Sequence, residues 1–369
     1  MSRPPIDYRS AGIDYSRIDA LKVLAQRAAA GTAGQLVGHG ARELERSRGE
    51  SAYVLEIDGL LIASITECLG TKALVADAVR ALSGRTHYDA LAQDTIAMAV
   101  NDLITVGAEP LSVHAYWAAG SSDWFSDHER MQDLVRGWQR SCELCAVAWG
   151  GGETPALPGV VQADCIDLAA SAVGVVRPRE RLMLGERLAA GDAIVLLGAS
   201  GIHANGVSLA RSLAAALPKG YATALPEGRA FGEALLDPTV LYVPALRALW
   251  QAGIAPHYAV NVTGHGWRKL MRHPSALTYR IRTLPPVPPV LAFLQREAGL
   301  DARAAYGSLN MGAGFAVFVA PAQAQAAVEA VRGAGLDAWA AGVVESGARR
   351  VVLEPLQLTF EAEELLLRA

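Results

Sequence analysis

The chain has 369 residues, of which 51% are hydrophobic and 19% are charged, and its formal net charge is −4. This length allows two domains with a core each, and the composition is that of a globular protein rather than a disordered one. The small negative charge argues against a nucleic-acid surface or a polybasic membrane anchor. No apolar run approaches the roughly 20 residues of a membrane-spanning helix, and residues 1–17 carry no apolar segment typical of a signal peptide. We therefore expect a cytoplasmic protein without membrane or nucleic-acid partners.

Two of the four cysteines, Cys142 and Cys145, form a C-x-x-C pair. This spacing occurs in metal and redox sites, but the pair lies in a helical pattern, with no second such pair and no nearby histidine. Two small apolar side chains three residues apart on a helix face the same way. We favour packing over chemistry for this pair.

In chain order, the first part reads as an α/β unit. Two β-rich runs, residues 52–57 and 60–66, are separated by Asp-Gly, which predicts a hairpin. Periodicity then predicts three helices, at 72–83, 89–108 and 128–148, with a short strand, "AVAW", at the end of the last one and a buried strand at 167–176.

The second part repeats this style after a polar, turn-rich stretch, so we place the domain boundary between residues 176 and 177. Apolar runs predict strands at 193–198, 314–320 and 337–345, and periodicity predicts helices at 206–217, 240–253 and 322–335. Strands and helices do not alternate strictly, which favours an α+β fold over a doubly wound sheet. The predicted domains are 1–176 and 177–369.

The hexapeptide "ECLGTK", from Glu67 to Lys72, follows the second predicted strand. An acid, a glycine, a hydroxyl and a lysine at a strand end suit a site for phosphate and a metal ion. The alternative is a surface turn with a solvated lysine.

The helix predicted at 89–108 is largely apolar but carries Asp94, Asn101 and Asp102 on one face, because spacings of seven and eight return to the same side. A carboxylate on a buried helix needs a partner. That partner is either a structural salt bridge or a divalent cation shared with Glu67.

Three consecutive glycines, Gly150 to Gly152, precede Glu153. Glycines permit close approach of a ligand to the backbone, and Glu153 offers a further oxygen ligand for Mg²⁺. A tight β-turn is the competing explanation.

In the second part, "ASGIHANG" places Ser200, His203 and Asn205 between a strand and a helix. The helix N-terminus can bind an anion and the histidine can move a proton, although an ordinary surface histidine is the alternative. Two more glycine-rich turns, "NVTGHG" and "LNMGAG", offer Thr263 and Asn310 as polar contacts. No Walker A motif, G-x-S-x-G motif or zinc spacing is present.

Six motifs together resemble one family. They are, in order, "DTIAMAVNDLITVGAEPL", "GGETPALPG", "SGIHANGVSLAR", "LLDPTVLYV", "VPPVLAFLQ" and "NMGAGF", and the opening "YRSAGIDYSRID" is also similar. This order resembles the aminoimidazole ribonucleotide synthetases, or phosphoribosylformylglycinamidine cyclo-ligases, over nearly the whole chain. The resemblance implies a two-domain α+β fold, with an N-terminal domain that forms a dimeric β-barrel and a C-terminal α/β sandwich domain.

The resemblance also implies a homodimeric, ATP- and Mg²⁺-dependent ligase of purine biosynthesis. Such an enzyme closes the imidazole ring of its small-molecule substrate, formylglycinamidine ribonucleotide, through a phosphorylated amide oxygen. Phosphoryl transfer depends mainly on positioning and charge neutralisation, which explains the missing nucleophile.

The implied site residues fall into four groups. The implied catalytic residues are His203, Lys72 and Asp94, and the implied metal ligands are Glu67, Asp94 and Glu153. The implied nucleotide contacts are Gly70, Thr71, Lys72, Asn101, Gly151, Gly152 and Glu153, and the implied substrate contacts are Ser200, His203, Asn205, Thr263 and Asn310.

The chain also departs from the family pattern. "ECLGTK" stands where Asp-Gly-Val-Gly-Thr-Lys is usual, the glycine-rich loop ahead of the first strand is replaced by "GQLVGHGARELERSRGE", and Asn261 and His265 stand where His and Gly are common. Two alternatives therefore accompany the cyclo-ligase: a paralogous ATP-dependent kinase or synthetase with another acceptor, and a nucleotide-binding relative without turnover.

Overall fold

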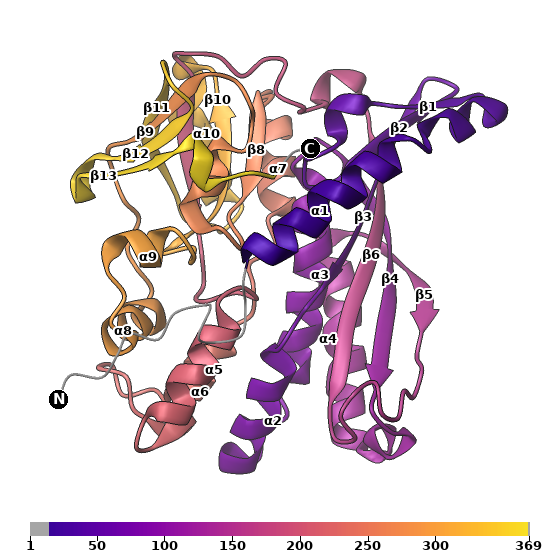
Figure 1. Cartoon of the computed structure of the whole chain (residues 1–369), viewed down its shortest axis with the longest axis vertical. Coiled ribbons are helices and arrows are strands. Elements are labelled where there is room, and N and C mark those ends of the chain that lie inside the picture. Colours follow the sequence, from indigo (N-terminus) through magenta and orange to yellow (C-terminus); the bar gives the residue numbers. More distant parts are fainter. Residues whose placement is uncertain (1–14, 368–369) are drawn as a thin grey trace.

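The structure is a computed structural model that describes residues 15–367, so most of the opening motif lies outside the described residues. Two sheets organise the chain (Figure 1). The first has the strand order β1-β2-β3-β6-β4-β5, and the second has the order β13-β12-β9-β11-β7-β10-β8. The α+β architecture predicted from the sequence is confirmed.

The first sheet packs one face against helices. Its strands are β1 (Ala41–Glu43), β2 (Tyr53–Ile57), β3 (Leu60–Cys68), β4 (Glu109–Ala119), β5 (Ala148–Glu153) and β6 (Ile166–Val176). Burial alternates along β6 from Ile166 to Val176, because every second side chain faces the core. The helices of this part are α1 (Tyr15–Ala30), α2 (Lys72–Ser83), α3 (Tyr88–Ile104) and α4 (His128–Cys145).

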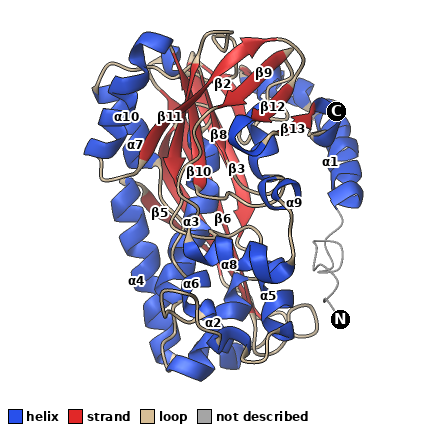
Figure 2. Ribbon diagram, turned by 90° about the vertical axis from the view of Figure 1, so that its left-hand side faces the viewer, coloured by secondary structure: helices blue, strands red, loops and turns tan. Residues whose placement is uncertain are grey.

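The second sheet contains β7 (Ala193–Gly198), β8 (Tyr258–Asn261), β9 (Leu277–Ile281), β10 (Ala313–Val319), β11 (Ala338–Ser346), β12 (Arg350–Leu353) and β13 (Leu358–Glu361). Its helices are α5 (Val207–Ala216), α6 (Phe231–Leu235), α7 (Val243–Gln251), α8 (Pro289–Ala298), α9 (Ala302–Tyr306) and α10 (Ala324–Gly333). Figure 2 shows α7 and α10 beside this sheet, while α5, α6 and α8 gather with α2 at the other end of the molecule.

The predicted hairpin is confirmed, since β2 and β3 pair antiparallel with Ile57 opposite Leu60. Strand β4 was not predicted, although it lies between β6 and β5. Its buried side chains Val113, Ala115 and Trp117 alternate with more exposed polar ones, the period-two pattern of a strand. The segment that replaces the family's glycine-rich loop supplies β1, which pairs with β2 at the sheet edge.

The C-x-x-C pair packs in the core. Both Cys142 and Cys145 are buried and free. Burial raises the pKa of Cys142 to about 11 and that of Cys145 to about 12, so both remain thiols at neutral pH. Within residues 15–367, no helix is both long enough and apolar enough to cross a membrane.

We expect Gly137→Ala to lower the free energy of unfolding by about 1–3 kcal/mol, because α4 crosses α3 very closely at this residue. A Cβ at Gly137 would lie 2.4 Å from the backbone oxygen of Asp89. Gly333→Ala is the matched control at the end of α10, where an added Cβ meets nothing within 4 Å. Urea unfolding should show no loss for the control, and equal effects of the two changes would contradict the close helix contact.

Candidate active site between the domains

Side chains of α3 hold a segment of the second domain, residues 239–242. The carboxylate of Asp94 accepts from the backbone nitrogen of Thr239 at 2.7 Å and from its hydroxyl at 2.5 Å. Asn101 donates to the carbonyl of Val240 at 2.8 Å and accepts from the nitrogen of Tyr242 at 2.9 Å. These side chains satisfy backbone groups that would otherwise be buried without partners. We call residues 239–242 with their α3 contacts the interdomain seam.

Lys72 and Asp94 form an ion pair next to the seam. Their charged atoms are 2.7 Å apart, and both side chains are fully buried. Lys72 also donates to the carbonyl of Asp237 at 3.1 Å. The structural salt bridge, one of the two interpretations left open for Asp94, is therefore present. The predicted contacts of this pair with ATP and Mg²⁺ stay predictions, and they require the pair to be exposed to a ligand.

A polar cavity of about 330 Å³ opens between the domains beside the C-terminal half of α3. We call it the cleft. Glu67 and Asp102 reach it from the first domain, and Thr263 and Lys269 reach it from the second. The remaining polar residues of its lining are Lys22, Glu50, Ser51, Asn205, His265 and Arg272. Carboxylates and cations from distant parts of the chain thus share one cavity.

Burial and the neighbouring charges shift the pKa values of the ionisable groups in the cleft. Burial, followed by the negative charge of Asp102, raises the pKa of Glu67 to about 7. Burial lowers the pKa of Lys269 to about 8, against the attraction of Asp102 and Glu67. Lys269 also donates to the hydroxyl of Thr263. At neutral pH the cleft therefore holds an acid and a base whose pKa values are close together, an arrangement typical of functional sites.

We expect Glu67→Gln to stabilise the protein increasingly as the pH rises from 5 to 7. Because the pKa of Glu67 is raised in the folded chain, the folded state binds more protons than the unfolded state in this window. The stability of the wild type therefore falls with rising pH on account of this group, and a glutamine removes that decline. The difference in free energy of unfolding should grow by about 1–2 kcal/mol across the window in urea titrations. A difference independent of pH would contradict the raised pKa.

A second, larger cavity adjoins the cleft. It measures about 620 Å³ and lies between α1 and strands β2, β3 and β6. It shares Lys22, Glu50, Ser51 and Ile65 with the cleft. The two volumes together suit two small molecules, or one large molecule such as a nucleotide.

His203 is buried and sits at a left-handed φ of 60°. Its Nε2 accepts from the backbone nitrogen of Ser200 at 3.2 Å. Burial, followed by the charge of Lys72, lowers the pKa of His203 to about 3, so the imidazole is neutral at physiological pH. The surface interpretation of this histidine is wrong. In this conformation His203 positions the loop, and it can become a proton donor only where a ligand supplies charge.

Of the other predicted substrate contacts, two line the cleft and two are engaged in hydrogen bonds with nearby loops. Asn205 and Thr263 line the cleft, and their contacts with a substrate stay predictions. Asn310 is buried, donates to the carbonyl of Gly201 at 2.8 Å and accepts from the nitrogen of Gly312 at 3.0 Å. Ser200 donates to the carbonyl of Pro238 at 2.6 Å. Both residues therefore support the loops around His203.

The three glycines belong to β5 rather than to a turn, which corrects the turn interpretation, whereas the predicted ligand contacts of Gly151 and Gly152 stay predictions. A Cβ at Gly152 would lie 2.1 Å from the backbone of Ala115, and one at Gly150 would lie 2.5 Å from His114. Gly151 has φ +106° at an irregularity in the pairing of β5 with β4. The glycines therefore serve the close pairing of an edge strand. Glu153 is exposed at the end of β5 and does not line the cleft.

The nucleotide contacts predicted at the start of α2 lie against the second domain. Gly70 has φ +74°, and the Thr71 hydroxyl is 3.3 Å from that of Ser208.

No group of three His, Cys, Asp or Glu side chains among the described residues is arranged to hold a metal ion. The set Glu67, Asp94 and Glu153 is therefore not assembled within one chain in this conformation.

Sequence reasoning did not single out Lys269, Lys22 or Arg272. All three line the cleft and supply its positive charge. Lys269 lies in a short 3-10 helix, Gly266–Met271, directly after the glycine-rich turn at 263–266. The run of basic residues after that turn was the available signal for Lys269 and Arg272.

The chain matches known families along both parts. Residues 49–176 match the N-terminal domain of AIR synthase related proteins, and residues 189–353 match the C-terminal domain of these proteins. A phosphoribosylformylglycinamidine cyclo-ligase of Carboxydothermus hydrogenoformans is 33% identical over 82% of this chain and 86% of its own length. One of Paraburkholderia xenovorans is 33% identical over 93% of both chains. The chain belongs to the AIR synthase related family, which confirms the family predicted from the motifs.

Solved structures share the fold. A ThiL protein complexed with AMPPCP and TMP has a TM-score of 0.57 at 17% identity and covers 85% of this chain and 90% of its own. A HypE protein in a HypE–HypF complex has a TM-score of 0.59 at 15% identity, over 85% of this chain and 93% of its own. A PurL protein of T. maritima complexed with FGAR has a TM-score of 0.57 at 16% identity, over 85% of this chain and 47% of its own. At these identities the likeness concerns the fold alone.

Proposed function

We propose that this protein is an ATP- and Mg²⁺-dependent cyclo-ligase that converts formylglycinamidine ribonucleotide into aminoimidazole ribonucleotide in purine synthesis. The similarity to cyclo-ligases over most of both chains supports this proposal. The cleft carries the proposal to particular residues, because carboxylates of the first domain and cations of both domains adjoin a cavity large enough for a nucleotide. We also propose the domain division 1–176 and 177–369 and a cytoplasmic location.

The residues of the cleft suit a magnesium triphosphate. Lys22, Lys269 and Arg272 are cations able to bind phosphate oxygens, and Glu67 and Asp102 are carboxylates able to bind a divalent ion. Because these two carboxylates are too few to saturate Mg²⁺, its other ligands would be phosphate and water oxygens. When bound, the ion neutralises charge on the transferred phosphoryl group.

The protein's own part is positioning and charge. Lys269 supplies a buried positive charge where negative charge develops on transfer. Asn205 and Thr263 offer an amide and a hydroxyl to orient the amide of the substrate. The neutral His203 lies in the same loop as Asn205 and is suited to stabilise the reacting oxygen once the loop meets a ligand.

Homodimerisation is part of the proposal. Large apolar side chains are exposed on α1, where Leu21 is 67% and Leu24 is 64% exposed, and on β4 and β5, where Tyr116 and Trp149 are more than a third exposed. Such surface is typical of an interface. A second copy would cover it and would bring another Glu153 to the assembly. Light scattering should give about twice the 38.8 kDa mass of the chain.

The function is tested with purified protein, formylglycinamidine ribonucleotide, ATP and Mg²⁺. The expected products are ADP, phosphate and the aminoimidazole, formed in equal amounts. ATP turnover only with another acceptor would identify a paralogous kinase or synthetase. Nucleotide binding without turnover on any acceptor would identify a non-catalytic relative.

A further inference from the structure

A separate polar cavity of about 340 Å³ lies between the domains beside the first turns of α3. Its walls come from the loop before α3, from α4, and from the second domain at residues 229–238. It shares no lining residue with the cleft, which adjoins Met98 and Asp102 further along α3. It is therefore a second interdomain space, which the proposed reaction does not use. We call it the α3 pocket.

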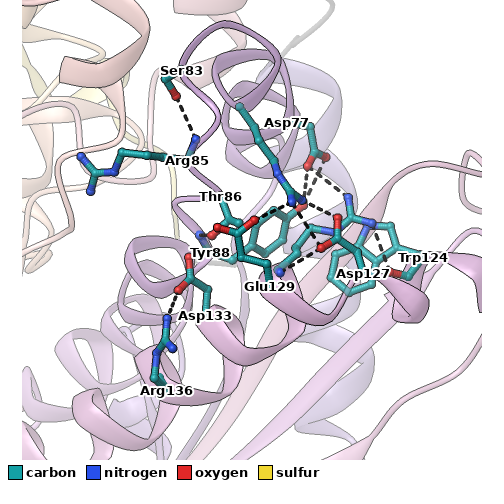
Figure 3. Close-up of polar contacts among 12 residues, drawn as sticks. Asp77, Ser83, Arg85, Thr86, Tyr88, Trp124, Asp127, Glu129, Asp133 and Arg136 are labelled. Atoms are coloured by element: carbon teal, nitrogen blue, oxygen red, sulfur yellow. Dashed lines mark hydrogen bonds and ion pairs between the residues drawn. The ribbon is translucent and has the colours of Figure 1, made fainter.

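Three arginines line the α3 pocket, and the side chains of two of them have no polar partner among the described residues. Arg229 is neutralised by Asp237, at 2.7 and 2.9 Å. Arg85 and Arg140 make no side-chain hydrogen bond or ion pair with any residue that the structure describes. Figure 3 shows the side chain of Arg85 pointing away from the cluster around Asp77 and Asp127, where the neighbouring arginines are paired. Two free guanidinium groups in one cavity are a strong anion-binding feature.

His87 adds an unsatisfied polar atom to the same wall. Its Nε2 is buried and has no hydrogen-bond partner among the described residues. The residue has φ 58°, in the left-handed region that few residues other than glycine adopt. Burial, followed by the charge of Arg85, lowers its pKa, so the ring stays neutral and can offer Nε2–H to a ligand. A buried polar atom without a partner among the described residues is a feature that a ligand would explain.

The pocket is also lined by Asp89 and Glu233, whose carboxylates make no hydrogen bond or ion pair with the residues that the structure describes. These carboxylates oppose a bare anion and favour a molecule that carries a positive group a few atoms from its negative group. The pocket volume is sufficient for such a small molecule.

We propose that the α3 pocket binds a small metabolite with a phosphate or carboxylate group on Arg85, Arg140 and His87 and an amine facing Glu233 and Asp89. The occupied pocket would join the first domain to residues 237–238. Because Lys72 donates to the Asp237 carbonyl and Thr239 bonds Asp94, the ligand would strengthen the interdomain seam. This site does not depend on the proposed reaction.

The test is isothermal titration calorimetry of the full chain with inorganic phosphate, O-phosphoethanolamine and β-alanine. O-Phosphoethanolamine or β-alanine should bind at least about 5-fold more tightly than inorganic phosphate, and whichever binds identifies the anionic group as phosphate or carboxylate. Arg85→Gln/Arg140→Gln should weaken that binding about 10-fold or more. Arg136→Gln, which removes a charge one turn away on α4, should leave it unchanged. Since the guanidinium groups of Arg85 and Arg140 make no hydrogen bond or ion pair with the described residues, the double variant should unfold at the wild-type temperature without ligand.

Two further variants make the outcome decisive. Glu233→Gln should tighten inorganic phosphate and weaken O-phosphoethanolamine, because the carboxylate repels the first and attracts the amine of the second. Lys269→Met removes a cation of the cleft and should leave binding at the α3 pocket intact. Loss of binding in Lys269→Met with retention in the double arginine variant would overturn the proposal, as would failure of all three probes to bind.

Discussion

Lys72→Met is expected to lower the free energy of unfolding by about 3–5 kcal/mol at pH 7. The substitution keeps the length of the side chain but leaves the Asp94 carboxylate buried without its counter-ion at 2.7 Å. Burial already raises the pKa of Asp94 against the attraction of Lys72, so removal of the lysine raises it further. The carboxyl group then takes up a proton more readily, and the loss should shrink as the pH is lowered from 7 to 5. Urea unfolding of the wild type and of Lys72→Met at pH 7 and at pH 5 measures this loss of stability.

The matched control is Lys72→Met/Asp94→Asn. An asparagine carries no charge and still accepts from the backbone nitrogen of Thr239, so the double variant should be more stable than Lys72→Met alone. If Lys72→Met proves as stable as the wild type, the pair is not buried in solution. The sequence-derived alternative, in which Lys72 faces a phosphate, would then gain support.

Lys269→Met is expected to lower kcat by about 10²–10³-fold with a smaller change in KM. This lysine is buried in the cleft and its positive charge cannot be replaced by solvent. Rates are measured by ADP release with saturating ATP and substrate. Lys219→Met, at an exposed lysine outside the cleft, should retain wild-type activity.

The balance between the two kinetic constants separates two roles for Lys269. A fall in kcat indicates that the charge stabilises the transition state, whereas a raised KM with unchanged kcat indicates uniform binding of a phosphate. Wild-type values of both constants would remove Lys269 from the site and would weaken the assignment of the cleft as the active site.

Much of the fold follows from periodicity and turn residues. The hairpin at 53–68, the helices from Lys72 and from Tyr88, and the buried strand ending at Val176 are all readable from local pattern, because each has one face on the core. The grouping of Asp94, Asn101 and Asp102 on one helix face was also predicted, and all three bond to the second domain. Strand β4 was missed because polar side chains on its open face dilute the apolar signal.

The site was less predictable, since its groups meet only through the packing of two domains. Glu67 was found because it ends a strand directly before a glycine-bearing turn, and Asn205 and Thr263 were found because they stand in such turns. Which of Arg268, Lys269 and Arg272 line the cleft depends on the turn of a short helix, and no local pattern decides it. A carboxylate such as that of Asp94 is a common metal ligand, but in the folded chain it forms a buried ion pair with Lys72.

The interdomain seam also affects how the protein denatures. Each half of the chain supplies partners for polar groups of the other, so an isolated half would leave Asp94 and Asn101 without Thr239 and Tyr242. Neither half is then expected to persist alone, and heat should melt both in a single cooperative step. Differential scanning calorimetry should therefore record one endotherm, whereas two domains that unfold independently would give two.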